Sequence, residues 1–566
     1  MRVPKRLIAA ASLPLSHRIY TIPAFLYRVE PSFLERRRRI HTNGVGPFRA
    51  GYTMDPAGID DKVSLSEDIP LDCKKIIRER IFCNRPLNMK SIVSVGFDMD
   101  YTLAQYKPES FESLTYRGTV EKLVKALKYP QELLDWSFDW TYMVRGLVVD
   151  KKRGNILKMD RHKYVKVAYH GFSEMSKQEK VGTYGSTLIR DSFDEPDYAL
   201  IDTLFSLAEA YLFAQLVDFR DENPQKVPDY LCMYNDVRSA VDLCHRDGTL
   251  KHMVVKDPQR FIHEDTGIVP MLKMLKDSGR STFLVTNSLW DYTNVVMNFL
   301  CGNSSLDGNP SKFDWLQYFD LVITGSSKPR FFHENHRAEL FAVELESGML
   351  VNTDNGTPLP QVGDTSPRRQ KQSYKIFQGG TVGHLHSLLS IDSGSQVLYA
   401  GDHIYGDILR SKKVLGWRTM LVVPELGKEV ELLWESRDTR KQLQSMRQQR
   451  AFVEDSIHTL VCMLLDESIE EMNKRGIVRE LRRLEGVKEN INSAHQQAVR
   501  QSHMKSHEVW GQLLKTGYQN SRFAHQVERF ACLYTSQVTN LRHYSPDKYY
   551  RPGDDFMPHE FDVLTV

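Results

Sequence analysis

The sequence has few of the features that mark disulfide-stabilised, zinc-binding or membrane-spanning proteins. Its 566 residues include only seven cysteines, an odd number, and no Cys-x-x-Cys pair. We therefore expect reduced thiols and no zinc site. No apolar run approaches the ~20 residues of a membrane span. The net charge is only +3, which argues against a protein dedicated to nucleic acids, because such a protein presents a strongly basic face.

Acidic residues are missing from the start of the chain. The first is Glu30, and five basic residues precede it: Arg2, Lys5, Arg6, Arg18 and Arg28. An Arg-rich, acid-poor, amphipathic start is typical of a mitochondrial transit segment. Pro4, Pro14 and Pro23 would interrupt a helix, so a disordered cytosolic arm is the alternative. We expect mitochondrial localisation, with cytoplasmic as the alternative, and set residues 1–52 apart as a targeting segment or arm.

Two carboxylates follow a short apolar run, Val93–Phe97. Side chains two residues apart on an extended strand point the same way, so Asp98 and Asp100 can face one reacting centre. Ligands of open α/β sheets bind at the carboxyl ends of the strands. One carboxylate can attack phosphorus and bind a cation, while its neighbour moves the proton of the leaving oxygen. The alternative is an Asp-rich turn without a catalytic role. A catalytic assignment therefore depends on whether later parts of the sequence supply the other residues of such a site.

Three further apolar runs end in polar groups, as central strands of a parallel sheet would. Alone, each polar end could be a cap, a solvated lysine or a turn. Together they bring hydroxyl and amide donors, one cation and a second pair of carboxylates to the strand ends. The runs are Ser281–Val285 before Thr286, Phe319–Thr324 before Lys328, and Gln396–Ala400 before Gly401–Asp407.

These segments resemble the four motifs of the haloacid dehalogenase superfamily: Asp98–Thr102, Thr286, Lys328 and Gly401–Asp407. Longer sequence segments around these motifs resemble the cytosolic purine 5′-nucleotidase family. Within that family, they resemble the branch called 5′-nucleotidase domain-containing proteins. The similarity runs from about Ser91 to Leu426. It implies a doubly wound α/β core with a parallel sheet, and a Mg²⁺-dependent phosphatase that acts on nucleotides.

The resemblance also implies roles for the motif carboxylates. Asp98 would be the nucleophile that forms an aspartyl-phosphate, and Asp100 the general acid that later acts as the base for water. Mg²⁺ would be held by Asp98, the main-chain carbonyl of Asp100, and Asp402, because small hard cations prefer oxygen ligands. Superfamily dehalogenases lack the acid that matches Asp100, so hydrolysis or transfer of a phosphomonoester is favoured.

The other motifs would handle the phosphoryl group. Thr286 and Lys328 would hold its oxygens, because phosphoryl transfer depends mostly on positioning and charge neutralisation. Asp407 would orient Lys328 or a metal-bound water. The rival interpretation is a non-catalytic member that keeps the fold and binds a nucleotide or protein. Complete motifs favour the enzyme.

Nearly two hundred residues separate Asp98 from Thr286, too many for a loop. We therefore predict an inserted cap domain over the site. After Pro424 the sequence is rich in Glu, Arg, Lys, Gln and Leu, and residues 429–449 and 469–499 predict long amphipathic helices. These helices could pack on the core or form an oligomer seam, and the resemblance implies homo-oligomers. The predicted boundaries are 53–123 and 281–425 for the core, 124–280 for the cap, 426–545 for the helical C-terminal region and 546–566 for the tail.

Substrate choice should come from the cap. Residues 236–245 predict a helix with Arg238, Asp242 and His245 on one face. From the residues alone, an Arg–Asp pair within the helix beside a rim histidine is the alternative. The resemblance implies that these three residues read the base of a purine nucleoside monophosphate and favours 6-oxopurines such as IMP and GMP. It also assigns substrate contacts to Phe205, Lys251, Asn287 and Ser288.

Some positions depart from the family pattern. An effector site of the purine enzyme is matched at Arg190 and Lys413, but its amide and aromatic members appear here as Asp202 and Tyr405. Arg246 stands where the family has an aromatic residue beside the base. The reaction type is therefore better supported by the sequence than the effector or the preferred base.

Overall fold

The computed structural model describes residues 77–185, 196–302, 313–333, 336–353, 375–465, 470–517 and 519–553. All of them belong to one of the chain's two compact units, Ile69–Val566. The targeting segment or arm predicted for residues 1–52 lies outside the described residues, as do Arg190 and most of the predicted tail.

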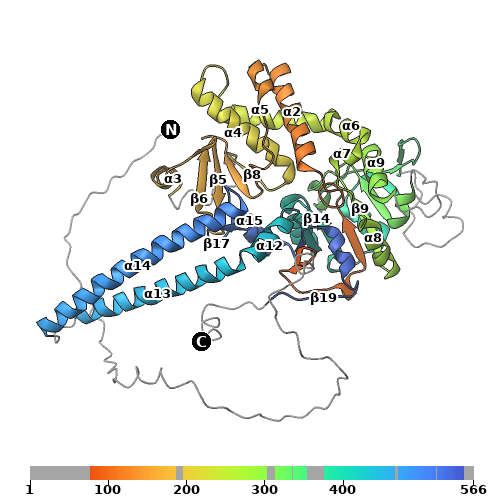
Figure 1. The fold of residues 1–566 in the computed structure, drawn as a ribbon. Coiled ribbons are helices and arrows are strands. Elements are labelled where there is room, and N and C mark those ends of the chain that lie inside the picture. Colours follow the sequence, from red (N-terminus) through yellow and green to blue (C-terminus); the bar gives the residue numbers. More distant parts are fainter. Residues whose placement is uncertain are drawn as a thin grey trace, which may run out of the picture. The chain divides into compact units, whose positions relative to one another are not determined.

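A ten-stranded sheet forms the centre of the described unit (Figure 1). Its central strands, from β18 to β13, run parallel, and antiparallel strands flank them on both sides. In spatial order the strands are β1 (Phe82–Cys83), β18 (Leu533–Thr535), β15 (Arg418–Val422), β14 (Val397–Gly401), β3 (Ser94–Phe97), β9 (Ser281–Val285), β10 (Leu321–Thr324), β13 (Ile376–Gly379), β11 (Leu340–Val343) and β12 (Leu350–Asn352). The chain thus has the predicted α/β core.

The four strands expected from the motifs are neighbours, in the order β14-β3-β9-β10. The chain leaves β3 for β9 and β10 on one side and later returns to β14 on the other side. The strand order therefore reverses between β3 and β14, which is where open α/β sheets bind their ligands. β3 is buried throughout, and a side chain at Gly96 would lie 2.1 Å from the ring of Phe283 on β9. Glycine at this position lets the two central strands pack closely.

The segment between β3 and β9 contains helices and a second sheet, which is antiparallel with the order β7-β6-β5-β4-β8. Helix α2 packs against α4 and α5, and the helix predicted at 236–245 lies within α5. The strands are β4 (Leu147–Asp150), β5 (Asn155–Met159), β6 (Val165–His170), β7 (Ser173–Glu174) and β8 (Tyr198–Ile201). The helices are α2 (Pro108–Lys125), α3 (Lys177–Tyr184), α4 (Leu207–Glu222), α5 (Tyr230–Arg246), α6 (Thr249–Lys256), α7 (Pro258–Phe261) and α8 (Ile268–Asp277).

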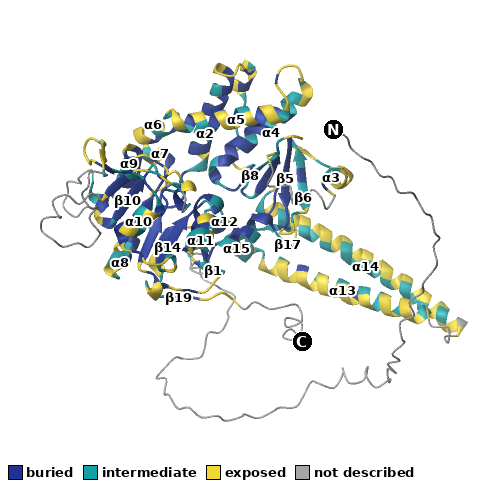
Figure 2. Ribbon diagram, turned by 180° about the vertical axis from the view of Figure 1, so that it is seen from behind, coloured by how far each residue is buried: buried dark blue, intermediate teal, exposed yellow. Residues whose placement is uncertain are grey.

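The remaining helices alternate with or follow the later core strands. They are α9 (Trp290–Cys301), α10 (Val382–Leu389), α11 (Arg410–Leu415), α12 (Leu426–Glu435), α13 (Arg437–Leu464), α14 (Glu471–Ser506) and α15 (Arg522–Phe530). Helices α13 and α14 lie side by side, and much of their surface is exposed (Figure 2). Within the described residues, no helix combines the length and apolar character needed to cross a bilayer.

The part of the chain after residue 425 also contains strands. β16 (Lys515–Thr516) pairs with β17 (Gln519–Asn520), and β19 (Tyr549–Tyr550) pairs with β2 (Leu87–Asn88). β18 joins the main sheet beside β15, with Met420 opposite Leu533. The region predicted as helical therefore also supplies one strand of the core sheet, because the chain returns to the sheet after α15.

Candidate active site

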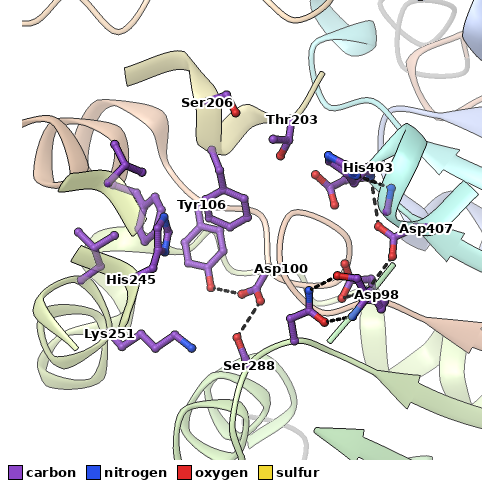
Figure 3. A pocket seen from close by; sticks show the side chains of 18 of the residues that line it. Asp98, Asp100, Tyr106, Thr203, Ser206, His245, Lys251, Ser288, His403 and Asp407 are labelled. Atoms are coloured by element: carbon purple, nitrogen blue, oxygen red, sulfur yellow. Dashed lines mark hydrogen bonds and ion pairs between the residues drawn. The ribbon is translucent and has the colours of Figure 1, made fainter. Parts of the chain in front are cut away.

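A cavity of about 430 Å³ opens where β3 and β14 end. Core residues line one wall, among them Asp98, Asp100 and Lys328. Residues of α5, including Arg238 and His245, line the other wall, and Figure 3 shows His245 across the cavity from Asp98. Of the residues predicted for the site, the lining set omits Thr286 and Asp242. The remaining predicted residues meet at this one cavity.

Lys328 lies between two carboxylates. Its Nζ is 2.7 Å from Oδ1 of Asp98 and 2.7 Å from Oδ1 of Asp407, and it donates to the hydroxyl of Tyr399 at 3.1 Å. Burial lowers the pKa of Lys328, but the Asp407 and Asp98 carboxylates outweigh burial and raise it well above its usual value. The lysine therefore stays cationic at neutral pH, as charge neutralisation at a phosphoryl group requires.

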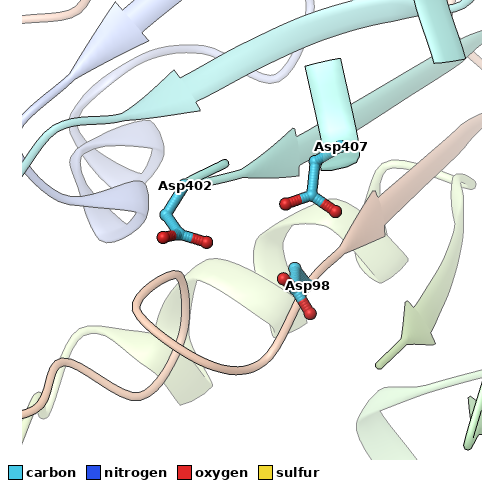
Figure 4. A group of neighbouring side chains, drawn as sticks. All are labelled: Asp98, Asp402 and Asp407. Atoms are coloured by element: carbon cyan, nitrogen blue, oxygen red, sulfur yellow. The ribbon is translucent and has the colours of Figure 1, made fainter. Parts of the chain in front are cut away.

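Asp98, Asp402 and Asp407 form a buried acidic cluster whose carboxylates converge (Figure 4). One oxygen from each lies within 4.8 Å of the others. A side chain at Gly401 would approach Cβ of Asp407 to 2.5 Å, so glycine is needed for Asp407 to sit this close to β14.

The charge balance of this cluster fits a bound cation. Burial raises the pKa of Asp98 well above its usual value; Lys328 opposes this rise, and neighbouring carboxylates add to it. Burial and then Asp407 raise the pKa of Asp402 to about 7. Within the described structure, Oδ2 of Asp402 is buried and accepts no hydrogen bond. A small divalent cation with oxygen ligands would satisfy that oxygen and offset the negative charge.

Asp100 is held by two hydroxyl donors. Tyr106 donates to Oδ1 at 2.6 Å and Ser288 donates to Oδ2 at 2.9 Å (Figure 3). The hydroxyls of Tyr106 and Tyr292 are 2.7 Å apart. Burial raises the pKa of Tyr106 well above its usual value, so the tyrosine remains a donor. The sequence analysis did not predict either tyrosine. The sequence holds a signal for Tyr106 alone, which follows closely after the turn that carries Asp98 and Asp100.

On the opposite wall, Arg238 contacts two carboxylates. One guanidinium nitrogen is 3.1 Å from Oδ1 of Asp242, four residues later on α5. The other donates to Oε2 of Glu209 on α4 at 2.8 Å. Glu209 is buried and also accepts the hydroxyl of Tyr234. The Arg–Asp pair within the helix, the alternative drawn from the sequence, is thus present. Glu209, which fixes Arg238, was not predicted.

Three further predicted substrate contacts, Phe205, His245 and Lys251, line the cavity together with Arg238. The rings of Phe205 and His245 meet edge to face with centroids 5.5 Å apart. Lys251 lies with Nζ 5.2 Å from the ring centroid of Tyr292. Burial, followed by the charges of Lys251 and Arg238, lowers the pKa of His245, so its imidazole is neutral at pH 7. Together with Arg238, these three residues therefore offer an aromatic ring, a neutral imidazole and two cations.

Comparison with known proteins supports the prediction drawn from the motifs. The model of the 5′ nucleotidase family matches residues 81–562, which is most of the chain. The chain belongs to the 5′-nucleotidase family.

Two curated relatives carry the same family name. A 5′-nucleotidase domain-containing protein of Dictyostelium discoideum is 28% identical over 491 residues, covering 85% of this chain and 75% of that protein. The 5′-nucleotidase domain-containing protein 2 of Rattus norvegicus is 25% identical over 508 residues, covering 87% and 82%. Family membership makes the chain a phosphoric monoester hydrolase and agrees with a nucleotide substrate, a divalent cation and the haloacid dehalogenase superfamily.

Two motif residues of this 5′-nucleotidase family member hold loops together. Thr286 is buried, and its Oγ1 accepts the backbone N–H of Ser288 at 3.0 Å. Asn287 lines the cavity, and its Oδ1 accepts the backbone N–H of Lys328 at 2.6 Å and the hydroxyl of Ser326 at 3.0 Å. Asn287 therefore fixes the loop that carries the lysine.

The fourth motif also touches the segment between β3 and β9. Nε2 of His403 is 3.5 Å from Oδ1 of Asp202, and its Nδ1 accepts the N–H of Gly406 at 2.5 Å. With Nδ1 directed at the Gly406 N–H, Nε2 is the ring nitrogen that can donate toward Asp202. Tyr405 instead accepts a hydrogen bond from Gln526 at 2.5 Å, while Lys413 lies over the ring of Phe530 with Nζ 5.2 Å from its centroid. Asp202, Tyr405 and Lys413, the effector positions within the described residues, thus have partners within the protein.

Proposed function

We propose that the chain is a Mg²⁺-dependent 5′-nucleotidase that hydrolyses purine nucleoside monophosphates through an aspartyl-phosphate on Asp98. The observation that carries this proposal is the position of Asp98 at the floor of the cavity. There it contacts Lys328 and shares a cluster with Asp402 and Asp407. A nucleophile, a fixed cation and a divalent-cation site are thus in one place.

The residues of this cavity divide the reaction between them. The Asp98 carboxylate attacks phosphorus, and Lys328 neutralises the charge on the phosphoryl oxygens. Asp100, held by Tyr106 and Ser288, gives its proton to the leaving 5′-oxygen. It then takes a proton from the water that hydrolyses the aspartyl-phosphate. A divalent cation held by Asp98 and Asp402 would supply further charge neutralisation for the phosphoryl group.

The opposite wall supports a 6-oxopurine. Such a base presents an acceptor, O6, beside a donor, N1–H, on one edge. Arg238 and Asp242 present a donor beside an acceptor, 3.1 Å apart. Phe205 lines the cavity and offers a ring for stacking. Lys251, also on the cavity surface, would contact the phosphate or ribose side of the nucleotide. IMP and GMP are the expected substrates.

A phosphate-release screen over nucleoside monophosphates with Mg²⁺ tests this function. Wild type should release phosphate from IMP and GMP faster than from CMP or UMP, and Asp98→Asn should release none. Equal release from purine and pyrimidine nucleotides would reject the base assignment. No release from any of them would instead favour a non-catalytic binding role.

We further propose that residues 124–280 act as a cap over the core. Two observations support this proposal. Residues of both the 124–280 segment and the core line the cavity, and Asp202 of that segment contacts His403 of the core. The chain is also proposed to form a homo-oligomer, which light scattering of the purified protein would measure.

The acid-free start supports a proposal of mitochondrial import. Fusing residues 1–52 to a fluorescent protein should direct the fusion to mitochondria, and replacing Arg2, Lys5, Arg6 and Arg18 with Gln should return it to the cytosol. A cytosolic signal from the unmodified fusion would reject the import proposal.

A further inference from the structure

A second cavity, of about 590 Å³, lies between the first half of α13, the end of α14 and residues 512–517. It shares no residue with the active-site cavity. Its described lining includes no Asp or Glu. Five of the lining side chains are basic: Arg437, Arg440, Lys441, Arg447 and Lys515.

The helical repeat gathers most of this charge on one face of α13. Arg437, Arg440 and Lys441 stand at i, i+3 and i+4, and Arg447 follows two turns after Arg440. Like charges at these spacings repel one another and weaken a helix. These four side chains are exposed, so solvent screens part of the repulsion, and an anion bound in the cavity would relieve more of it.

The rest of the hairpin shows how such charges are usually balanced. Arg483 pairs with Glu480 at 2.6 Å, and Lys488 on α14 lies 3.5 Å from Glu454 on α13. In the described structure, by contrast, Arg440 and Lys441 form no ion pair with a carboxylate. Arg440 and Lys441 thus bring to this cavity two charges without a carboxylate partner among the described residues.

Nearby polar groups leave the cavity positive. Arg437 donates to the carbonyl of Trp434 at 3.3 Å and lies over its ring. Glu429 is buried, but its carboxylate already accepts the N–H groups of Leu513 at 2.6 Å and Leu514 at 3.2 Å. Burial lowers the pKa of Lys515, and the charge of Arg440 lowers it further, while Glu429 and Glu528 oppose this shift.

We propose that this cavity binds a small oligophosphate, an anion with two or more linked phosphate groups. Guanidinium groups match phosphate oxygens with two parallel hydrogen bonds, and lysines add point charges. The five basic side chains exceed what one phosphate needs. Leu433, Leu443 and Val499 also line the cavity, so an apolar group attached to the phosphates has surface to cover. The near-neutral net charge of +3 favours a local small-ligand site over a nucleic-acid surface.

Calorimetric titration of the full chain with inorganic tripolyphosphate, without divalent cations, tests the site. Arg440→Gln with Lys441→Gln should weaken one binding event at least tenfold. Arg483→Gln with Lys488→Gln, an equal charge change on α14 outside the cavity, should leave it within twofold. Orthophosphate should bind wild type more weakly than tripolyphosphate. Equal losses in the two double variants, no binding at millimolar tripolyphosphate, or tighter binding of a single-stranded oligonucleotide would each overturn the proposal.

Two measurements separate the site from a merely structural role. Without ligand, the Arg440→Gln, Lys441→Gln variant should melt no lower than wild type, because repulsion has been removed; a lower Tm would indicate a structural role. In wild type, tripolyphosphate should slow acetylation of Lys441 and Lys515 by acetic anhydride, read by mass spectrometry, and leave Lys488 unchanged. Unprotected Lys441 and Lys515 would overturn the proposal independently of any variant.

Discussion

The two walls of the active-site cavity are built differently. On the core wall, the side chains of Lys328, Asp98 and Asp407 are 4%, 11% and 2% exposed and are tied together by ion pairs. On the opposite wall, the side chain of Arg238 is 49% exposed, and Asp242, which pairs with it from outside the described cavity lining, is 47% exposed. If one of the buried ion pairs is broken, water cannot replace the lost partner. At the half-exposed Arg238–Asp242 pair, water can.

This difference predicts how each wall responds to change. A charge removed from the core wall leaves a buried partner uncompensated, so both activity and stability should suffer. A charge removed from the half-exposed wall is replaced by water, so the effect should be smaller and confined to substrate choice. We therefore expect the core wall to determine the reaction and the other wall to determine which phosphomonoester enters.

The largest effect should come from the nucleophile. Asp98→Asn should lower kcat for IMP by on the order of 10⁴-fold or more, because an amide neither attacks phosphorus nor offsets the charge of a cation. Lys328 keeps its 2.7 Å contact with Asp407, so the variant should still fold, as circular dichroism would show. A kcat near wild type would mean that another group attacks phosphorus.

The buried lysine should matter next. Lys328→Met should lower the free energy of unfolding by about 3–5 kcal/mol without divalent cations, since it leaves Asp98 and Asp407 unpaired. Denaturant titration measures this change, and adding Mg²⁺ should recover part of it. Lys226→Met is the control, because its pair with Glu132 is about half exposed and should contribute under ~1 kcal/mol. Equal losses in the two variants would contradict the contrast between the walls.

A buried acid links the Asp100 turn to helix α2. Tyr101 donates to Glu112, and burial raises the pKa of Glu112 to about 8. Because the folded state holds this proton between pH 4.5 and about 8 while the unfolded state releases it, stability should fall as pH rises through that range, by a few kcal/mol at most. Glu112→Gln should flatten this slope in denaturant titrations from pH 5 to 9. An unchanged slope would show that Glu112 does not cause it.

The sequence predicted the core wall better than the opposite wall, because local patterns reveal buried strands but not contacts between residues that are distant in sequence. Ser281–Val285 was predicted as a strand and is one, because a buried parallel strand is a short, mostly apolar run that the sequence shows directly. β18 is only three residues long and pairs with β15 and β1, both far earlier in the sequence, so local pattern could not reveal it. Glu209 lies in an apolar stretch of α4. A lone carboxylate in such a stretch indicates a buried polar contact. The sequence could not show that Arg238 is its partner, because Arg238 is distant in sequence.

The smallest effect should fall on substrate choice. Asp242→Ala should raise KM for IMP about tenfold or more, because a hydrogen bond to a charged group contributes roughly 1.5–3 kcal/mol. KM for an aryl phosphate, which has no purine edge, should change little. Asp236→Ala is the matched control, because Asp236 is also an α5 carboxylate outside the described cavity lining. It accepts a hydrogen bond from Tyr129 at 2.8 Å, whereas Asp242 pairs with Arg238 of the cavity wall. Equal changes in KM for IMP and the aryl phosphate would mean that Asp242 only holds Arg238. Arg238, which Glu209 also holds in place, would then be the residue that selects the base.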